Sequence, residues 1–389
     1  MPQNNFLRFW KLKKMLHILF LPSWYPNHKN DLDGNFIQNH AKAVAIKHKV
    51  SVLFITSIQK PSQTFTFETK EKGNLTEYYG YYKSTSFFLL KIYRWLKCFY
   101  SLFNKIKPFD GIHVHVFKKM GILGILFAFF TNKKIILTEQ YSGVHQLKSK
   151  SIIYRKWHSF WYKKYDAILP VSNSLKVVFE EIGISQHKLN VVYNVVDTSI
   201  FKPNKNRAEN TKFEFLHISN FAKIKNVEGI LIAFKKLLED DPNCNLTILG
   251  DGNLQDVVNH ANGLKIPQEN IHFVGKIMPD FLAVYYQNAD TFILNSHKET
   301  FGVVLAESLC CGCPVITTKN GGYSDEMTTE EGFVIPPNDS EALLEAMKKM
   351  IATKNQWHRD EIAQNAVSKF GETAISEQLN TIYLKIFNS

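Results

Sequence analysis

Short apolar segments recur along almost the whole 389-residue chain and alternate with stretches of helical periodicity. In the first half they are residues 16–21, 50–55, 111–116, 134–138, 167–171 and 190–193. In the second half they are residues 214–218, 245–249, 271–274, 291–294, 314–317 and 333–335. Continuous apolar strands indicate sheets covered on both faces, which is typical of parallel sheets. Because these strands are too many for one ordinary sheet, the pattern predicts an α/β chain with two doubly wound domains.

The net charge changes sign between the two halves. Residues 1–200 contain 29 Lys and Arg against 11 Asp and Glu, a net +18, whereas residues 201–389 contain 18 against 24, a net −6. The polar stretch 201–212 lies where the sign changes, and its composition is typical of a linker. The sequence therefore predicts an N-terminal domain over 1–200 and a second domain from 201.

Several classes of protein are not supported by the composition. The five cysteines are too few and too clustered for a disulfide framework or a zinc site, which favours a reduced, cytoplasmic setting. The longest apolar runs are shorter than the roughly 20 residues of a membrane-spanning helix. The basic, aromatic N-terminus lacks a cleavage site, so we do not interpret it as a signal peptide. No motif typical of nucleic-acid binding is present.

A helix predicted over 87–105 has an unusual surface. Lys91, Arg94 and Lys97 recur every third residue, with aliphatic and aromatic residues between them. That composition is typical of a helix that lies in a membrane interface, although a helix packed on its own sheet would explain it too. Together with the basic arm 8–14 and the +18 half, it predicts docking of the first domain on an anionic membrane, at the inner face of the plasma membrane.

The motif with the clearest chemical meaning follows the predicted strand 291–294. Glu299 lies in the loop after this strand, and Glu307 lies in the second turn of the helix that follows. Gly302 and the amide of Val303 form the start of that helix, where free amides and the helix dipole favour a phosphate group. Gly302 has no Cβ, so a diphosphate can come close to the backbone.

A second cationic position lies after the strand 214–218. Lys225 precedes a predicted helix, where a lysine can reach phosphate oxygens and neutralise a leaving diphosphate. The one Asp-x-Asp spacing is Asp31 and Asp33, in an N-terminal loop rather than after a central strand. We therefore expect no metal and no cofactor, with phosphate handled by amides and Lys225.

These motifs, in this order, resemble those of the family 4 retaining glycosyltransferases. The resemblance includes Glu299-x7-Glu307, Gly-Cys-Pro-Val-Ile at 312–316, Gly-Gly at 321–322 and the strand followed by Lys225. It continues through residues 22–26, 34–36, 171–175, 192–197, 249–252 and 331–339.

The resemblance implies the GT-B architecture, with two Rossmann-like domains facing a central cleft and a C-terminal helix, 371–389, packed back toward the first domain. The donor would be a nucleotide diphosphate sugar. Glu307 would hold the ribose hydroxyls, Glu299 the sugar and Lys225 the diphosphate, while Gly34 would let a loop of the first domain approach the phosphates.

Two positions depart from the family pattern. Asn220 stands where members usually have an arginine in the donor site, and Lys223 could supply that charge. Gln140 stands where many members have a catalytic histidine; it can hydrogen-bond a sugar but cannot shuttle a proton. His145 and His115 are alternative candidates for that role.

The resemblance predicts a metal-independent hexosyltransferase that uses a glycan or lipid-linked acceptor in envelope polysaccharide or lipopolysaccharide synthesis. Two other functions fit the same donor site. One is a nucleotide-sugar 2-epimerase of the same fold, and the other is a catalytically silent sugar-nucleotide-binding protein.

Overall fold

The computed structural model describes residues 15–388 except 32, 60–62 and 107, so the basic arm 8–14 lies outside the described residues. The chain divides into two compact units. The first contains the described residues up to Glu139, residues 160–169 and the end of the chain from Ser376. The second contains residues 140–159 and 170–375. The predicted boundaries at 200 and 370 stay predictions.

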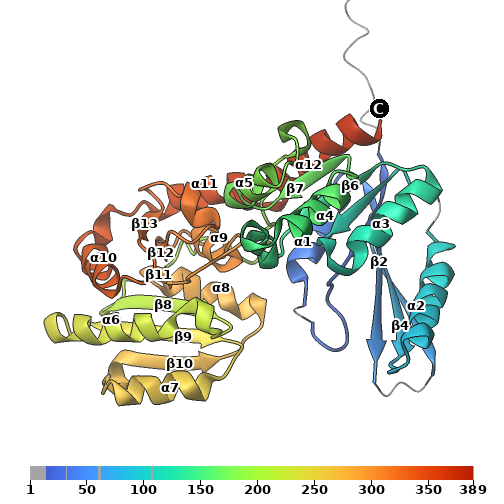
Figure 1. Cartoon of the computed structure of the whole chain (residues 1–389). Coiled ribbons are helices and arrows are strands. Elements are labelled where there is room, and N and C mark those ends of the chain that lie inside the picture. The colour runs from blue at the N-terminus through green and yellow to red at the C-terminus, as the bar shows by residue number, and fades with distance from the viewer. Residues whose placement is uncertain (1–14, 32, 60–62, 107, 389) are drawn as a thin grey trace, which may run out of the picture. The chain divides into compact units, whose positions relative to one another are not determined.

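The sheet of the first unit has the strand order β3-β4-β2-β1-β5-β6-β7 (Figure 1). Its strands are β1 His17–Pro22, β2 Lys49–Ile58, β3 Phe65–Lys72, β4 Leu75–Lys83, β5 Gly111–His115, β6 Ile135–Glu139 and β7 Ala167–Pro170. The central pairs are parallel, as the apolar runs predict, whereas β3 pairs antiparallel with β4 at the edge.

Two features of this region differ from the sequence prediction. The hairpin of β3 and β4 is not predicted, because β3 is an exposed edge strand without an apolar run and β4 is rich in tyrosine. Residues 190–193 are predicted as a strand but have no regular structure in the second unit, so that prediction is wrong. Their apolar side chains serve packing: Val192 is fully buried, and the ring of Tyr193 lies 5.8 Å from that of Phe301.

The first unit also contains α1 Asn35–Ala45, α2 Phe88–Phe103, α3 Phe117–Thr131 and residues 160–162 of α4 Ile152–Tyr162. Helices α2 and α3 lie side by side, because the ring of Phe127 meets those of Phe99 and Phe103 at 5.1 and 4.5 Å. The same helix α2 buries Cys98, Leu102 and Phe103, so it packs on its own sheet. Within the described residues, no helix has both the length and the apolar composition needed to span a membrane.

The second unit has a parallel sheet in the order β10-β9-β8-β11-β12-β13. Its strands are β8 Phe213–Ser219, β9 Cys244–Gly250, β10 Ile271–Gly275, β11 Thr291–Leu294, β12 Val315–Thr318 and β13 Gly332–Ile335. Its helices are α5 Asn173–Glu181, α6 Val227–Asp240, α7 Leu254–Gly263, α8 Pro279–Asn288, α9 Val303–Cys310, α10 Ser340–Ala352 and α11 Arg359–Phe370. The two parallel α/β sheets confirm the predicted fold class.

The strand order reverses between the neighbours β8 and β11. From β8 the chain continues to β9 and β10 on one side, and from β11 it continues to β12 and β13 on the other. At such a reversal the loops leave the carboxyl ends of two adjacent strands in opposite directions, and ligands of α/β sheets bind in the crevice between them. The sheet topology therefore marks the loops after β8 and β11 as the candidate site.

The final helix, α12 Glu372–Phe387, begins in the second unit, and its part from Ser376 belongs to the first. There Tyr383 is fully buried, and its hydroxyl lies 2.7 Å from Nδ1 of His113 in β5. The polar stretch 201–212 is held in the second unit, where Arg207 forms a 2.6 Å ion pair with the buried Asp290.

Candidate functional site

The loop after β8 is shaped by residues that tolerate unusual backbone angles. Asn220 is exposed, and its side-chain oxygen accepts a hydrogen bond from the amide of Ala222. A 3-10 turn, Lys223–Lys225, follows, and Asn226 then adopts a left-handed conformation with φ 48°. The side chain of Asn226 caps α6 by accepting from the amide of Gly229. Asn is one of the few residues that adopt this conformation and cap a helix, so the turn and the helix start are fixed together.

The loop after β11 lies against the loop after β8. The amide of His297 donates to the carbonyl of Ile224 at 2.8 Å. The Nζ atom of Lys225 then lies 2.5 Å from Oε1 of Glu299, and both side chains are largely buried, 19% and 11% exposed. The structure thus brings together two predicted site residues that are 74 positions apart in the sequence. At this distance and degree of burial the pair is only partly screened by water.

Helix α9 begins at Val303, directly after Gly302. Gly302 has φ 87°, a conformation that favours glycine, and no side chain caps the helix. A hypothetical Cβ at Gly302 would be 3.5 Å from its nearest neighbour, so the backbone angle rather than crowding accounts for the glycine. The start of α9 therefore offers backbone amides to an anion.

Glu307 lies in the second turn of α9. Its carboxyl accepts a 3.2 Å hydrogen bond from the hydroxyl of the fully buried Tyr286 in α8. Burial raises the pKa of Glu307 to about 8 despite this hydrogen bond. A carboxyl with this pKa can lose a proton near neutral pH when donors such as ribose hydroxyls approach.

The sequence does not predict two backbone contacts of the site. The amide of Glu299 donates to the carbonyl of Asn320 at 3.0 Å, and Ser172 Oγ donates to the carbonyl of Thr300 at 2.8 Å. Together with Tyr286 they hold the two predicted glutamates in position. Ser172 lies in the segment 171–175 that carries part of the family resemblance, but nothing in that segment indicates its distant backbone partner.

Gly34 lies in the first unit, at the start of α1, with φ 73°. Its missing Cβ would lie 2.8 Å from the backbone of Trp24 and Tyr25. This crowding, which even an alanine would not tolerate, gives the glycine a structural reason besides the predicted approach to phosphate.

Gln140 follows β6 and is 9% exposed. It belongs to the second unit, as does His145. Burial, with smaller contributions from Lys298 and Lys148, lowers the pKa of His145 to about 4. His115, at the end of β5, is fully buried, and burial lowers its pKa well below the usual value. Both histidines are therefore neutral at physiological pH, so neither is a ready proton donor.

Lys223 has a different environment from Lys225. It is exposed and lines a cavity of about 380 Å³ with Asn226, His297 and residues of α6 and α7.

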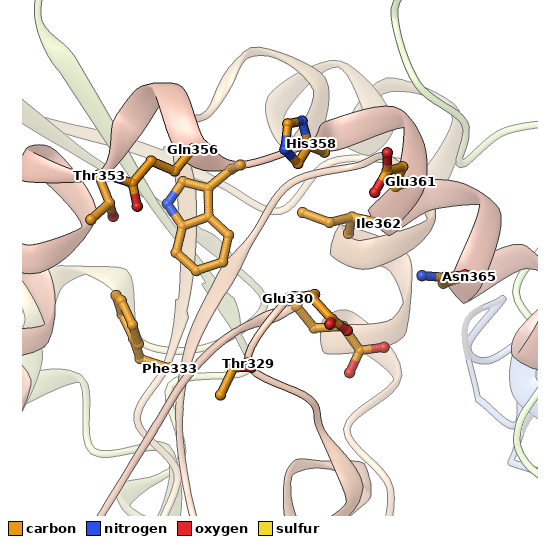
Figure 2. Close-up of a pocket in the computed structure, with 11 residues that line it drawn as sticks. Thr329, Glu330, Phe333, Thr353, Gln356, His358, Glu361, Ile362 and Asn365 are labelled. Atoms are coloured by element: carbon orange, nitrogen blue, oxygen red, sulfur yellow. The ribbon is translucent and has the colours of Figure 1, made fainter.

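Another cavity of the second unit, of about 570 Å³, lies beside α11. Its lining includes the aromatic residues Phe333 and Trp357 and the acidic residues Glu330 and Glu361, and Figure 2 shows several of these side chains. None of the predicted site residues lines either cavity.

Among the described residues, no group of three or more His, Cys, Asp or Glu side chains is arranged to hold a metal ion.

Comparison with family models and curated proteins points to one family. Residues 34–200 match the model "Glycosyltransferase Family 4", and residues 199–369 match "Glycosyl transferases group 1". The N-acetyl-alpha-D-glucosaminyl L-malate synthase of Bacillus anthracis is 28% identical over 240 residues, which cover 58% of this chain and 61% of that protein, less than two thirds of its length. The capsular polysaccharide biosynthesis glycosyltransferase CapM of Staphylococcus aureus is 25% identical over 306 residues, 72% of this chain and 78% of that one.

Among solved structures, the sucrose-phosphate synthase of Thermosynechococcus elongatus superimposes with a TM-score of 0.77 at 17% identity, covering 96% of this chain and 99% of that one. The similarity shows the GT-B fold that the sequence predicts.

Gly302 in the second unit and Gly34 in the first allow the cost of backbone strain to be compared with the cost of strain plus steric crowding. Gly302→Ala should lower the free energy of unfolding by roughly 1–2 kcal/mol, the cost of a left-handed alanine. Gly34→Ala should lower it by more, because its Cβ also meets the Trp24 backbone. Thermal unfolding of both variants measures the difference. An equal or smaller loss for Gly34→Ala would contradict the crowding.

Glu307→Gln should stabilise the protein in a pH-dependent way. A carboxyl whose pKa is raised to about 8 from 4.5 binds its proton more tightly in the folded state, so the folded protein loses stability as pH rises from 4.5 to 8. The amide has no charge to bury and can still accept from Tyr286. Denaturant unfolding should therefore show equal stabilities near pH 4 and a variant that is the more stable at pH 8. A constant difference across this range would show that burial does not perturb Glu307.

Proposed function

The chain belongs to the glycosyltransferases of family 4, and from this premise we propose that it transfers a sugar from a nucleotide diphosphate sugar to a glycan or lipid-linked acceptor. The observation that carries the proposal is the 2.5 Å contact between Lys225 and Glu299 at the point where the strand order reverses. One cation, one carboxylate and the uncapped start of α9 come together there, on loops of two adjacent strands.

The donor changes the partners of these groups. Without donor, Lys225 and Glu299 neutralise each other. When a diphosphate arrives, Lys225 binds its oxygens together with the amides at Gly302 and Val303, and Glu299 becomes available for the hydroxyls of the sugar. Glu307, one turn further into the helix, accepts hydrogen bonds from the ribose hydroxyls. Asn220, exposed beside this loop, contributes hydrogen bonds to the donor but no charge.

The chemical step needs a stabilised leaving group more than an acid and a base. As the bond between the anomeric carbon and the diphosphate breaks, negative charge grows on the leaving phosphate oxygen. Lys225 and the α9 amides are fixed before this happens, so they stabilise the transition state more than the ground state. The acceptor oxygen forms its bond on the face that the diphosphate leaves, and its proton passes to the leaving phosphate oxygen. The anomeric configuration is then retained without a metal.

Two further residues complete the proposal. We propose that the backbone at Gly34 approaches the donor phosphates and that Gln140 is a catalytic residue that hydrogen-bonds the sugar. The lowered pKa values of His115 and His145 make both imidazoles weak bases, which supports a mechanism in which the leaving phosphate, not a histidine, accepts the proton.

Charge and one relative support the proposed acceptor class. CapM is named for capsular polysaccharide biosynthesis. The net +18 of residues 1–200 suits a membrane that carries anionic lipids. We therefore propose a glycan or lipid-linked acceptor in envelope polysaccharide synthesis and a peripheral location at the inner face of the plasma membrane.

A 2-epimerase or a silent sugar-nucleotide-binding protein would share the donor site. An epimerase interconverts nucleotide-sugars without acceptor, whereas a transferase releases nucleotide faster when a suitable acceptor is present. Nucleotide release with and without lipid-linked acceptors separates the three functions. Absence of both release and epimerisation across a panel of donors that bind would favour the silent protein.

Lys225→Ala should reduce sugar transfer by roughly 10- to 150-fold, because a hydrogen bond to a charged group contributes about 1.5–3 kcal/mol. The loss should appear in kcat if the contact strengthens as the diphosphate leaves. Lys235→Ala is the matched control: it removes a lysine of α6 that forms an ion pair with Glu239 of the same helix. Steady-state rates for both variants test the assignment. Unchanged kinetics in Lys225→Ala, or an equal loss in Lys235→Ala, would overturn it.

Transfer should continue in the presence of excess chelator, since Lys225 and backbone amides rather than a metal ion hold the diphosphate. The measurement compares initial rates in chelator with rates after magnesium or manganese is added back. A strict dependence on either ion would show that the diphosphate is held differently.

A further inference from the structure

The outer surface of α2 carries apolar side chains from end to end. The start of the helix exposes Phe87, Phe88 and Leu89 at 75%, 72% and 78%. Its next turns expose Ile92, Tyr93, Leu96 and Tyr100. The opposite side of the helix buries Cys98 and Leu102 against the sheet, so the helix packs on its own domain and still leaves a second apolar face in solvent.

The neighbouring helix α3 extends this surface. Phe129 and Phe130 at its end are 79% and 80% exposed, and Leu123 and Leu126 are partly exposed. Because the ring of Phe127 joins α3 to α2, the exposed residues of both helices lie on adjoining elements of one unit. Single exposed apolar residues need no explanation, but a patch of this extent marks an interaction surface. We call these residues of α2 and α3 the apolar face.

The part of the sequence that contains the apolar face is rich in cations. Between Glu77 and Glu139 the sequence contains ten Lys and Arg and one acidic residue, Asp110. On α2, Arg94 donates to the carbonyl of Lys83, and the ammonium of Lys97 lies 4.8 Å from the centre of the Phe65 ring. Both contacts tie the helix to the β3–β4 hairpin and leave the positive charges uncompensated.

We propose that the apolar face inserts into the interface of an anionic bilayer, with α2 and α3 lying in the membrane plane. Aromatic and aliphatic side chains enter the boundary between headgroups and acyl chains, and the flanking cations bind anionic headgroups. A helix of α2's length, 16 residues, covers about 24 Å of surface in this orientation. This inference rests on the proposed function for its biological purpose, but its test does not require activity.

Charge and composition favour a bilayer over a protein partner. A second copy of the chain would present the same cations, and like charges oppose such an interface. Each Lys or Arg near an anionic surface strengthens binding roughly fivefold, so the cations draw the unit to the membrane, while the apolar side chains resist its release. The combination predicts binding with two components, one sensitive to salt and one not.

The test uses the full chain and two kinds of phosphatidylcholine vesicle, one without anionic lipid and one with about 30% phosphatidylglycerol, which gives a strongly negative surface. Co-sedimentation at low and high salt gives the two components. We expect binding that rises with anionic lipid, falls with salt and keeps a measurable remainder at high salt. Equal recovery in the supernatant with neutral and anionic vesicles would overturn the proposal.

Two variants identify the surface. The triple change Phe87→Ser, Phe88→Ser and Leu89→Ser should weaken partition at least tenfold and remove the salt-resistant component. The matched control changes Met278, Phe281 and Val284 to Ser, three exposed apolar residues at α8 of the second unit, and should bind as the unchanged chain does. Unchanged binding of the first variant, or equal losses in both, would overturn the proposal.

Two further measurements separate the remaining explanations. Light scattering without vesicles reports self-association. If the chain forms a dimer that the α2 triple variant loses, the apolar face is an interface between copies and the membrane proposal fails.

Nucleotide release with a soluble donor and no vesicles reports the transferase site. Normal release with no vesicle binding would reject the docking alone, and normal binding with no release for any donor and acceptor would reject the transferase alone.

Discussion

The reversal of strand order between β8 and β11 is the constraint on which the candidate site depends. Parallel strands end at one edge of the sheet, and at a reversal no connecting helix covers the gap between two neighbouring carboxyl ends. Lys225 follows β8 and Glu299 follows β11, so the topology alone places a cation and a carboxylate side by side. The hydrogen bond from the His297 amide to the Ile224 carbonyl then fixes the two loops against each other.

The buried parts of the fold could be predicted from the sequence because burial on both faces leaves an apolar run. Strands such as β1 and β11 are buried and largely apolar on both faces, so the apolar run predicts them. The β3–β4 hairpin could not be predicted in this way, because β3 is an exposed edge strand whose polar and charged residues leave no apolar run. Residues 190–193 have the opposite property: an apolar run that packs without joining a ladder. Apolar runs therefore indicate burial, and strand pairing has to be established separately.

The candidate site was predictable to the extent that backbone geometry demands particular residues. Gly302 and Asn226 directly precede α9 and α6 and have left-handed backbone conformations, which favour glycine and asparagine over other residues. The roles proposed for Lys225, Glu299 and Glu307 came from their spacing and from the family resemblance, and they stay predictions. The role of Tyr286 could not be predicted: its hydroxyl donates to Glu307, but the sequence of an amphipathic helix does not indicate whether a tyrosine in it has such a partner.

Each unit contains a feature that lowers the free energy of unfolding: a desolvated carboxyl in the second unit and exposed apolar side chains in the first. In the second unit, desolvation raises the pKa of Glu307 to about 8, so the charged form of its carboxyl is disfavoured. The first unit leaves aromatic side chains of α2 and α3 in water, where they gain nothing from the hydrophobic effect. Selection for stability alone would favour substitutions that remove such features. Under the two proposals above, hydroxyl donors of a nucleotide-sugar would offset the cost at the carboxyl, and a bilayer would offset the cost at the apolar face.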